Sequence, residues 1–209
     1  MKVHRTKDRK PISPRLASAR ERIDRTAYEL FSRHGIRAVG IDTVVAHSGV
    51  AKMTLYRHYA SKDKLALAFL RRREELWTRA WLQEEVERRA QIPGERLLAV
   101  FDTFDAWFRR SDFEGCSFAK ALLEQSDPWH PVRTAAVRHI ETIRALLSQW
   151  IEDAGVRNPD RFARQWQILM MGSIIAAYAG DLNAAKRARE LGVLLLVREG
   201  VAIGKRCRA

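Results

Sequence analysis

The chain of 209 residues is long enough for one compact domain together with a smaller one. Hydrophobic residues make up 46% of it and charged residues 30%, a balance that excludes wholesale disorder. The formal net charge of +13 is placed unevenly, because residues 1–75 carry 18 Lys and Arg against 8 Asp and Glu, whereas residues 76–209 carry 20 against 17. A basic N-terminal third predicts a polyanion-binding end, with nucleic acid as the first candidate and an anionic membrane surface as the alternative.

Cysteine content and hydropathy predict the compartment. The chain has 2 cysteines, Cys116 and Cys207, in no paired spacing, which favours a reducing compartment and provides no disulfide or zinc framework. No apolar region follows the basic start, and no stretch approaches the roughly 18 apolar residues of a membrane span. We therefore expect a cytoplasmic protein with no secretory signal and no membrane partner.

In chain order, the first predicted segment is a basic arm. Residues 1–17 carry six Lys and Arg, one acid and two prolines without periodicity. This composition predicts a flexible segment that either contacts DNA or is a disordered solubilising tail. Order is expected to begin at Ser18, which with Glu21 fits a capping box, and Gly35 is expected to end this first helix.

Three further helices complete the N-terminal part. A short helix is predicted to hold Ile41, Val44 and Val45, and a second one covers about residues 51–59. The pair Ser48–Gly49 makes the turn between them. A fourth helix is expected to begin after Ser61 and to run towards Arg89, with Pro93–Gly94 ending it.

The remainder also has helical signals. Leu97, Phe101, Phe104 and Phe108 recur at i, i+4, i+7 and i+11, which is typical of a buried helix face. Later caps and breaks predict four more helices: a short one after Gly115 to about Gln125, a long one started by Asp127–Pro128 or His130–Pro131 and ending near Gly155, one from Asn158–Pro159 to Gly180, and a last one from Asp181 or Asn183. Since no alternating β-branched run appears, the sequence predicts an all-α fold of about nine helices, with a basic three-helix head on a larger body.

The head has the order of a helix-turn-helix, which lays its second helix in the DNA major groove. We expect Val50, Leu55 and Tyr59 to face inward. The residues left on the outer face of the second helix can bond phosphates or base edges: Lys52, Met53, Thr54, Tyr56, Arg57 and His58. Lys62 and Lys64 stand at the N-terminus of the next helix, where the free N–H groups also favour an anion.

Residues of about 20–66 resemble the N-terminal domain of TetR/AcrR-type transcriptional regulators. The resemblance rests on the order of Ala27–Phe31 with Gly35, the segment IDTVVA at 41–46, and above all GVAKMTLYRHY at 49–59 followed by SKDKL at 61–65. The rest of the chain has the length and helix order of that family's ligand-binding and dimerisation domain. The resemblance thus implies a DNA-binding domain at 18–66, an effector-binding and dimerisation domain at 67–209, and a ligand-responsive regulator, by family default a repressor.

The resemblance also implies roles for single residues. Thr43, Lys52, Met53 and Thr54 lie where family members approach bases or nearby phosphates, and Tyr56, Arg57, His58 and Lys62 lie where they hold the backbone. The chain departs from the family pattern in two places. Val39–Gly40 stand where a hydroxyl usually caps the second helix, and Lys64 replaces the usual acid, so that Ser61 has no capping-box partner.

A homodimer would place two heads about one helical turn of DNA apart, or a multiple of it. The last two long helices are the expected interface, since small residues there would let helices approach closely and larger ones add buried area. Ordinary packing within one chain is the alternative explanation. The predicted interface residues are Gly172, Ile175, Ala176, Ala188, Leu191 and Leu195.

Aromatic and Met residues of the middle helices suit an adaptable apolar pocket for a small apolar or aromatic effector. Each of them alone is as easily explained by core packing. The predicted pocket residues are Phe104, Trp107, Phe108, Cys116, Phe118, His139, Trp166, Met170 and Tyr178.

Motifs of catalysis are missing from the sequence. There is no phosphate-binding glycine loop, no HExxH and no GxSxG, and the histidines have no metal-ligand spacing. We therefore expect no enzyme activity, no cofactor and no metal. The alternative, a helical small-molecule-binding protein or enzyme with an incidental basic head, would give no sequence-specific DNA footprint. A membrane-surface protein would need a broad amphipathic basic helix, whereas these basic residues are concentrated on a short helix and the arm.

Overall fold

The structure is a computed structural model that describes residues 17–204, and within that range every regular element is helical. The predicted arm of residues 1–17 falls, apart from its last residue, outside the described residues. The long helix of the N-terminal half is continuous from Lys62 to Arg89, and counting it once gives nine helices in the described range. The predicted all-α class and helix number are confirmed.

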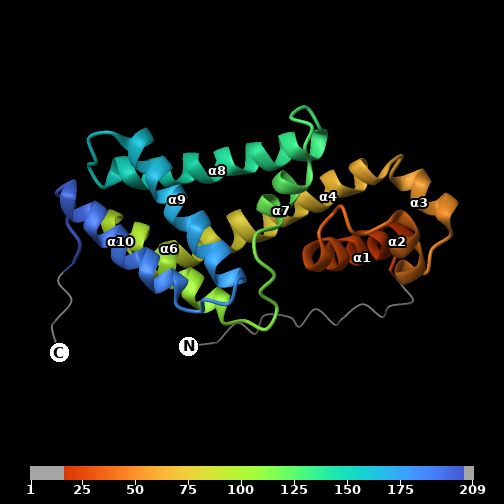
Figure 1. The fold of residues 1–209 in the computed structure, drawn as a ribbon, viewed down its shortest axis with the longest axis horizontal. Coiled ribbons are helices and arrows are strands. Elements are labelled where there is room, and N and C mark those ends of the chain that lie inside the picture. The colour runs from red at the N-terminus through yellow and green to blue at the C-terminus, as the bar shows by residue number, and fades with distance from the viewer. Residues whose placement is uncertain (1–16, 205–209) are drawn as a thin grey trace, which may run out of the picture.

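The head consists of three helices stacked at one end of the molecule (Figure 1). Their bounds are α1 (Ala19–His34), α2 (Ile41–Ser48) and α3 (Lys52–His58). The predicted capping box is present, because the Glu21 N–H donates to Ser18 Oγ at 3.2 Å and the Ser18 N–H donates to Glu21 Oε2 at 2.7 Å. Gly49 ends α2 with a φ of 63°, a left-handed conformation that a side chain would oppose, and so produces the sharp turn into α3.

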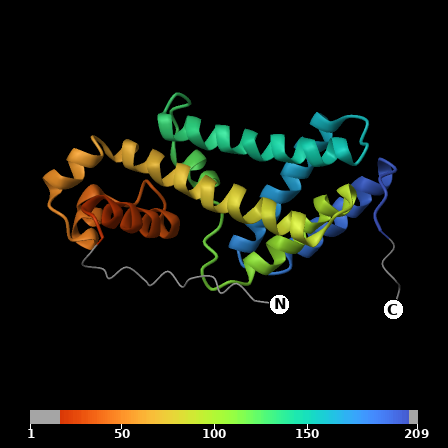
Figure 2. The same ribbon diagram turned by 180° about the vertical axis from the view of Figure 1, so that it is seen from behind.

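A single long rod connects the head to the body, as Figure 2 shows most clearly. It is formed by α4 (Lys62–Glu74), a π-helical stretch η1 (Glu75–Gln83) and α5 (Glu84–Arg89). Ser61 begins it by accepting the Lys64 N–H at 3.2 Å. Contrary to expectation, Pro93 does not end this rod but is the first residue of the following helix, where its missing N–H costs nothing.

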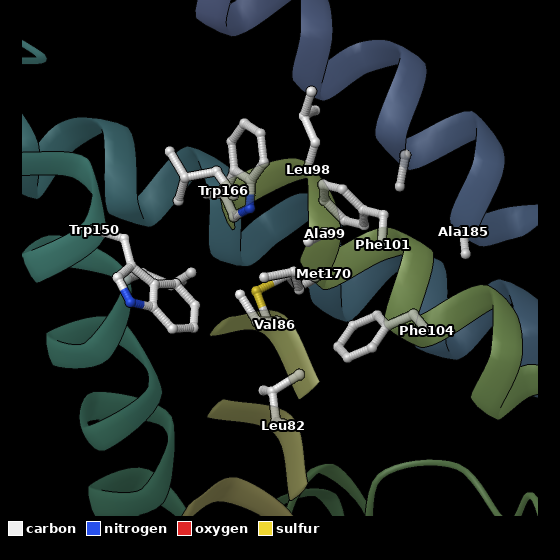
Figure 3. Packing of buried hydrophobic residues seen from close by; sticks show 14 of the residues in the cluster. Leu82, Val86, Leu98, Ala99, Phe101, Phe104, Trp150, Trp166, Met170 and Ala185 are labelled. Carbon is white, nitrogen blue, oxygen red and sulfur yellow. The ribbon is translucent and has the colours of Figure 1, made fainter. Parts of the chain in front are cut away.

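The remaining helices form the body. Their bounds are α6 (Pro93–Phe108), α7 (Ser117–Glu124), α8 (Pro131–Asp153), α9 (Pro159–Tyr178) and α10 (Ala184–Arg198). Leu82 and Val86 from the rod, Phe101 and Phe104 from α6 and Met170 from α9 point into one apolar interior (Figure 3). No helix in the described range is long and apolar enough to cross a membrane.

A second apolar core holds the head against the body. It joins Phe31 of α1 and Leu55 of α3 to Phe69 of α4, and it continues into Phe118 of α7 and Val132 of α8. The head is therefore packed on the body by α4, α7 and α8 rather than tethered by a linker, so a movement inside the body can reach the head through these contacts.

Candidate functional site

The third helix divides its residues between the head core and the surface. Leu55 is fully buried, and Val50 and Tyr59 are nearly so, which confirms all three predicted inward positions. Tyr59 is fixed further by donating its hydroxyl to Asp24 of α1. Because these side chains anchor one face of so short a helix, its opposite face is left free for a partner.

That opposite face contains the predicted DNA-contacting residues. Lys52, Tyr56, Arg57 and His58 are exposed, and Met53 is 72% exposed. Single exposed apolar side chains are common on protein surfaces, so Met53 is accessible to a partner but does not by itself mark a contact surface.

Polar residues of this face have mutual contacts that DNA could replace. Lys52 Nζ lies 2.7 Å from Asp42 Oδ1, and this hydrogen bond raises the pKa of the lysine. Arg57 Nη2 donates to Thr54 Oγ1 at 3.1 Å. Ion pairs between exposed side chains contribute about 0–1 kcal/mol, so exchanging the carboxylate for a phosphate costs little.

The start of α2 lacks a side-chain cap. Gly40 is the N-cap residue with no side-chain hydrogen bond, and Val39 is 4% exposed in the head core. Thr43 is exposed on the first turn, and its carbonyl lies 2.8 Å from His47 Nδ1. The departure at Val39–Gly40 thus has a packing reason, since Val39 is committed to the core and only backbone N–H groups remain here for an anion.

At the start of α4, Lys62 is already engaged in a hydrogen bond within the chain, which the sequence does not indicate. Lys62 is half-buried, and its Nζ donates to the Arg37 carbonyl at 3.1 Å. Burial lowers the pKa of Lys62, against the raising effect of Glu124 and Asp63. A phosphate contact by Lys62 would have to share or displace this bond, whereas Lys64 is exposed on the same turn.

Four of the predicted pocket residues surround one small apolar cavity of about 30 Å³. They are Phe104, Cys116, His139 and Met170. Met171, the neighbour of Met170 among the Met residues of the middle helices, also lines it, and the sequence provides no signal for the other wall residues: Trp77, Ile140, Ile143, Gln167 and Ile174. Trp77 belongs to the long rod that connects the head to the body. The helical period alone does not tell that a side chain of this connecting helix lines a cavity.

The remaining predicted pocket residues do not line this small cavity and lie in different parts of the body. Trp107 lines a different cavity, Phe108 is buried beside it, and Phe118 lines a groove along α4 and α8. Two further predicted residues line neither of these cavities nor the groove. Trp166 is fully buried in the core against Phe101 and Phe162, and Tyr178 is 57% exposed with its ring under Lys120.

His139, Cys116 and Gln167 bring polar groups to the wall of the small cavity, and the Gln167 amide already donates to a backbone carbonyl of α8. The His139 ring stacks on Phe118 with centroids 3.3 Å apart, and its Nδ1 lies 3.3 Å from Glu74 Oε2. Burial lowers the pKa of His139, against the raising effect of Glu74, and burial raises the pKa of the Cys116 thiol. Both groups are therefore held neutral, and Glu74 connects the cavity directly to α4, the helix that leads to the head.

The last two helices present an apolar surface to solvent. Along α9 it contains Ile168 at 70% exposure and Ile175 at 50%; along α10 it contains Leu191 at 50%, Leu194 at 66% and Val197 at 60%. Side chains of this size exposed together mark an interaction surface.

The other predicted interface residues of α9 and α10, and the glycines beside them, are divided between the buried face and the exposed face of these helices. Gly172 is exposed, and Ala176 and Leu195 are half-buried. Ala188 is 6% exposed and packs inside the chain, so it offers little surface to a partner. Gly192 is packed under the Trp166 ring, since a Cβ there would lie 2.7 Å from a ring carbon. Most of the small side chains thus serve packing within the subunit, and the larger ones form the free surface.

Two family descriptions match the chain. Residues 23–69 match "Bacterial regulatory proteins, tetR family", and residues 93–191 match "Tetracyclin repressor-like, C-terminal domain". The first match covers the head with the beginning of the rod, and the second covers α6 to α9 and part of α10.

Individual relatives are more distant. An uncharacterized HTH-type transcriptional regulator of Mycobacterium tuberculosis is 25% identical over 174 residues, 81% of this chain and 80% of that protein. Another M. tuberculosis protein, named as a transcriptional regulator of mycofactocin biosynthesis, is 30% identical over 96 residues, which span 45% of this chain and only 48% of that protein.

Solved structures share the whole fold. A TetR-family transcriptional regulator from Streptomyces coelicolor superposes with a TM-score of 0.75 at 28% identity, over 86% of this chain and 94% of that one. A second regulator, from Streptomyces avermitilis, gives a TM-score of 0.79 at 26% identity, over 89% of this chain and 100% of that one.

Proposed function

Because the chain belongs to the TetR family of DNA-binding transcription regulators, we propose that it is a homodimeric repressor. In this proposal it binds a palindromic operator, is released from it by a small apolar or aromatic effector, acts in the cytoplasm and catalyses no reaction. The observation that carries the proposal is the outer face of α3, where polar, basic and apolar side chains stand exposed on a helix that is anchored by Leu55.

The exposed face of α3 divides into two proposed roles. Lys52, Met53 and Thr54, together with Thr43 of α2, would approach bases and the nearest phosphates. Met53 would supply an apolar contact, such as one to a thymine methyl group. Backbone contacts fall to the residues nearer the C-terminal end of α3 and the start of α4: Tyr56, Arg57, His58 and Lys62.

Dimerisation is proposed through the exposed apolar surface of α9 and α10. A second copy would cover Ile168 and Ile175 of α9 and Leu191 and Leu194 of α10, and a two-fold axis would present the same surface from both subunits. Gly172 is open in this chain, with no atom within 4 Å of where its Cβ would be, so a partner helix could approach closely at that point.

The small cavity around Phe104, Cys116, His139 and Met170 is the proposed effector site. At about 30 Å³ it is smaller than most ligand pockets, which measure ~300–1,000 Å³, so an effector must displace side chains to enter. Methionine side chains suit such rearrangement. Displacing His139 would also disturb its contact with Glu74 on α4, and a ligand that binds the altered state better would shift the heads away from operator spacing.

The proposed DNA reading is tested by selecting bound sequences from a random DNA pool and footprinting the selected site. A palindrome with two protected half-sites is expected. Lys52→Ala should weaken binding and reduce the salt slope by about one unit, whereas Thr54→Ala should change base preference.

Lys186→Ala is the matched control, since it removes an exposed lysine of α10, far along the chain from the head. It should leave both affinity and salt slope unchanged. A protein that enriches no sequence, or whose affinity is the same in Lys52→Ala and Lys186→Ala, contradicts the proposed function.

A further inference from the structure

A second and larger cavity lies between the head and the body. It encloses about 380 Å³, within the ~300–1,000 Å³ usual for small-molecule sites. Its wall combines residues of α1, of the rod where α4 passes into η1, of the end of α6 and of the segment that follows α6. The residues of the proposed effector site lie in the other cavity, and only Trp77 lines both.

One side of this cavity is aromatic. The rings of Trp77 and Trp81, both from the π-helical stretch η1, lie 5.3 Å apart between centroids. Trp107 of α6 lies 5.0 Å from Trp77 and 6.1 Å from Trp81. At these separations the three indoles pack against one another and form one aromatic wall, against which a flat ring can lie.

Arg73, about one helical turn before Trp77 on the same rod, also lines the cavity and has no acidic partner among the described residues. Arg73 Nη1 donates to the Tyr28 hydroxyl at 2.9 Å, and its guanidinium lies 5.6 Å from the Tyr28 ring centroid. No carboxylate of residues 17–204 lies within ion-pair distance of it. Its charge is therefore available to an anion that enters from the cavity.

The other two arginines of the wall are already paired. Arg110 holds Asp112 through two hydrogen bonds of 2.7 Å, and Arg33 lies 3.7 Å from Glu114. Arg73 contributes from a distance to lowering the pKa of Asp112, but Arg110 makes the contacts. The remaining acid of the wall, Glu29, is an exposed side chain of α1.

Two buried polar atoms on the wall lack hydrogen-bond partners. Ser32 is 3% exposed and its Oγ is unbonded, and the Nε1 of Trp77 is likewise buried and unbonded. An unpaired buried polar atom costs about 1–3 kcal/mol, so a ligand that bonds it recovers part of that cost. The hydroxyl and the indole N–H can both donate to a carboxylate, which reaches them only once the neighbouring side chains move, because both atoms are covered in this structure.

From these features we infer that the cavity is a ligand site for a planar aromatic acid. The ring of the ligand would lie against the wall that the three indoles form, and its acidic group would be bound by Arg73 with the hydroxyl of Ser32. Because α1 forms one wall and α6 with the following segment the other, such a ligand joins head to body next to the Arg33–Glu114 contact. That it changes operator affinity rests on the proposed repressor function; that it binds does not.

The test is isothermal titration calorimetry of the full chain with 2-naphthoate and with its neutral counterpart 2-naphthamide. The acid should bind about tenfold or more tightly than the amide, because a charge-assisted bond to Arg73 is available only to the acid. Arg73→Gln should lower the affinity for the acid to that for the amide, and Arg73→Lys should restore part of the difference between the two affinities. Ser32→Ala should also lower the affinity for the acid.

Arg71→Gln is the matched control, because Arg71 is an exposed arginine of the same helix that does not line this cavity. It should bind the acid like the unchanged protein. Absence of binding, equal affinity for acid and amide, or equal binding by folded Arg73→Gln overturns the assignment.

The experiments distinguish a failure of the proposed ligand site from a failure of the proposed repressor function. If the chain selects an operator but 2-naphthoate does not bind, only the site is wrong. If 2-naphthoate binds as expected and no operator is selected, the site stands and the repressor function is wrong. With both present, adding 2-naphthoate to the operator complex should change its dissociation constant, and Arg73→Gln should abolish that change.

Discussion

Replacing Leu194 by alanine tests whether α9 and α10 form the dimer interface. Leu194 is 66% exposed on α10, so the free chain loses almost no packing when it is shortened, and alanine favours a helix. The substitution therefore changes the free energy of dimerisation only if a partner subunit covers this side chain.

The magnitude follows from the exposed fraction. Complete burial of a leucine stabilises by about 1.5–3 kcal/mol, so covering two thirds of it contributes about 1–2 kcal/mol. A two-fold interface contains the residue twice, which makes about 2–4 kcal/mol for each dimer and an increase of about 30- to 1,000-fold in the dissociation constant.

Sedimentation equilibrium over a concentration series measures that constant. Leu123→Ala is the matched control, because Leu123 is 79% exposed but lies on α7. The reasoning is refuted if Leu194→Ala and Leu123→Ala dissociate at the same concentration as the unchanged protein while all three remain folded.

Stability measurements provide further predictions. Gly192→Ala places a Cβ 2.7 Å from a ring carbon of Trp166 and should destabilise by about 1–3 kcal/mol in urea unfolding. Gly172→Ala meets no atom within 4 Å in this chain and should stabilise the isolated subunit by about 0.5–1 kcal/mol; a loss there instead would contradict its open environment. His139 should make stability depend on pH. Burial lowers its pKa against the opposing effect of Glu74, so the unfolded chain, with a histidine pKa of about 6.5, binds the proton more readily. The contribution of neutral His139 is therefore present above about pH 6.5 and is lost as the pH falls below it. His139→Gln should flatten this part of the urea midpoint profile, and an unchanged slope between about pH 5 and 7 would show that the ring does not titrate in this way.

Local signals were sufficient to predict the helices and the outer face of α3. Ser18 with Glu21, Gly35 and Gly49 act on backbone groups a few residues away, and their effect does not depend on the rest of the fold. The inward and outward positions of α3 follow from the helical period once Leu55 is taken as an anchor. The identity of the DNA contacts on that face remains a prediction.

The division of α9 and α10 into inner and outer faces was decided by the tertiary structure. Both faces carry small and apolar residues, so the helical period alone gives no reason to place Gly192 inside and Gly172 outside. Trp166, which lies beside Gly192, makes that choice by filling the space where a side chain would stand. The tertiary structure likewise decided that Ala188 packs inside the chain.

What the sequence by itself determined is therefore what short-range physics controls: the helix ends, the charged head and the exposed face of α3. Only the tertiary structure decided which aromatic residues share a cavity, because Ser32, Trp77 and Trp107 are far apart in the chain and belong to three different helical elements. Their common wall depends on how those helices pack, and packing is set by the sum of many long-range contacts that no local pattern records.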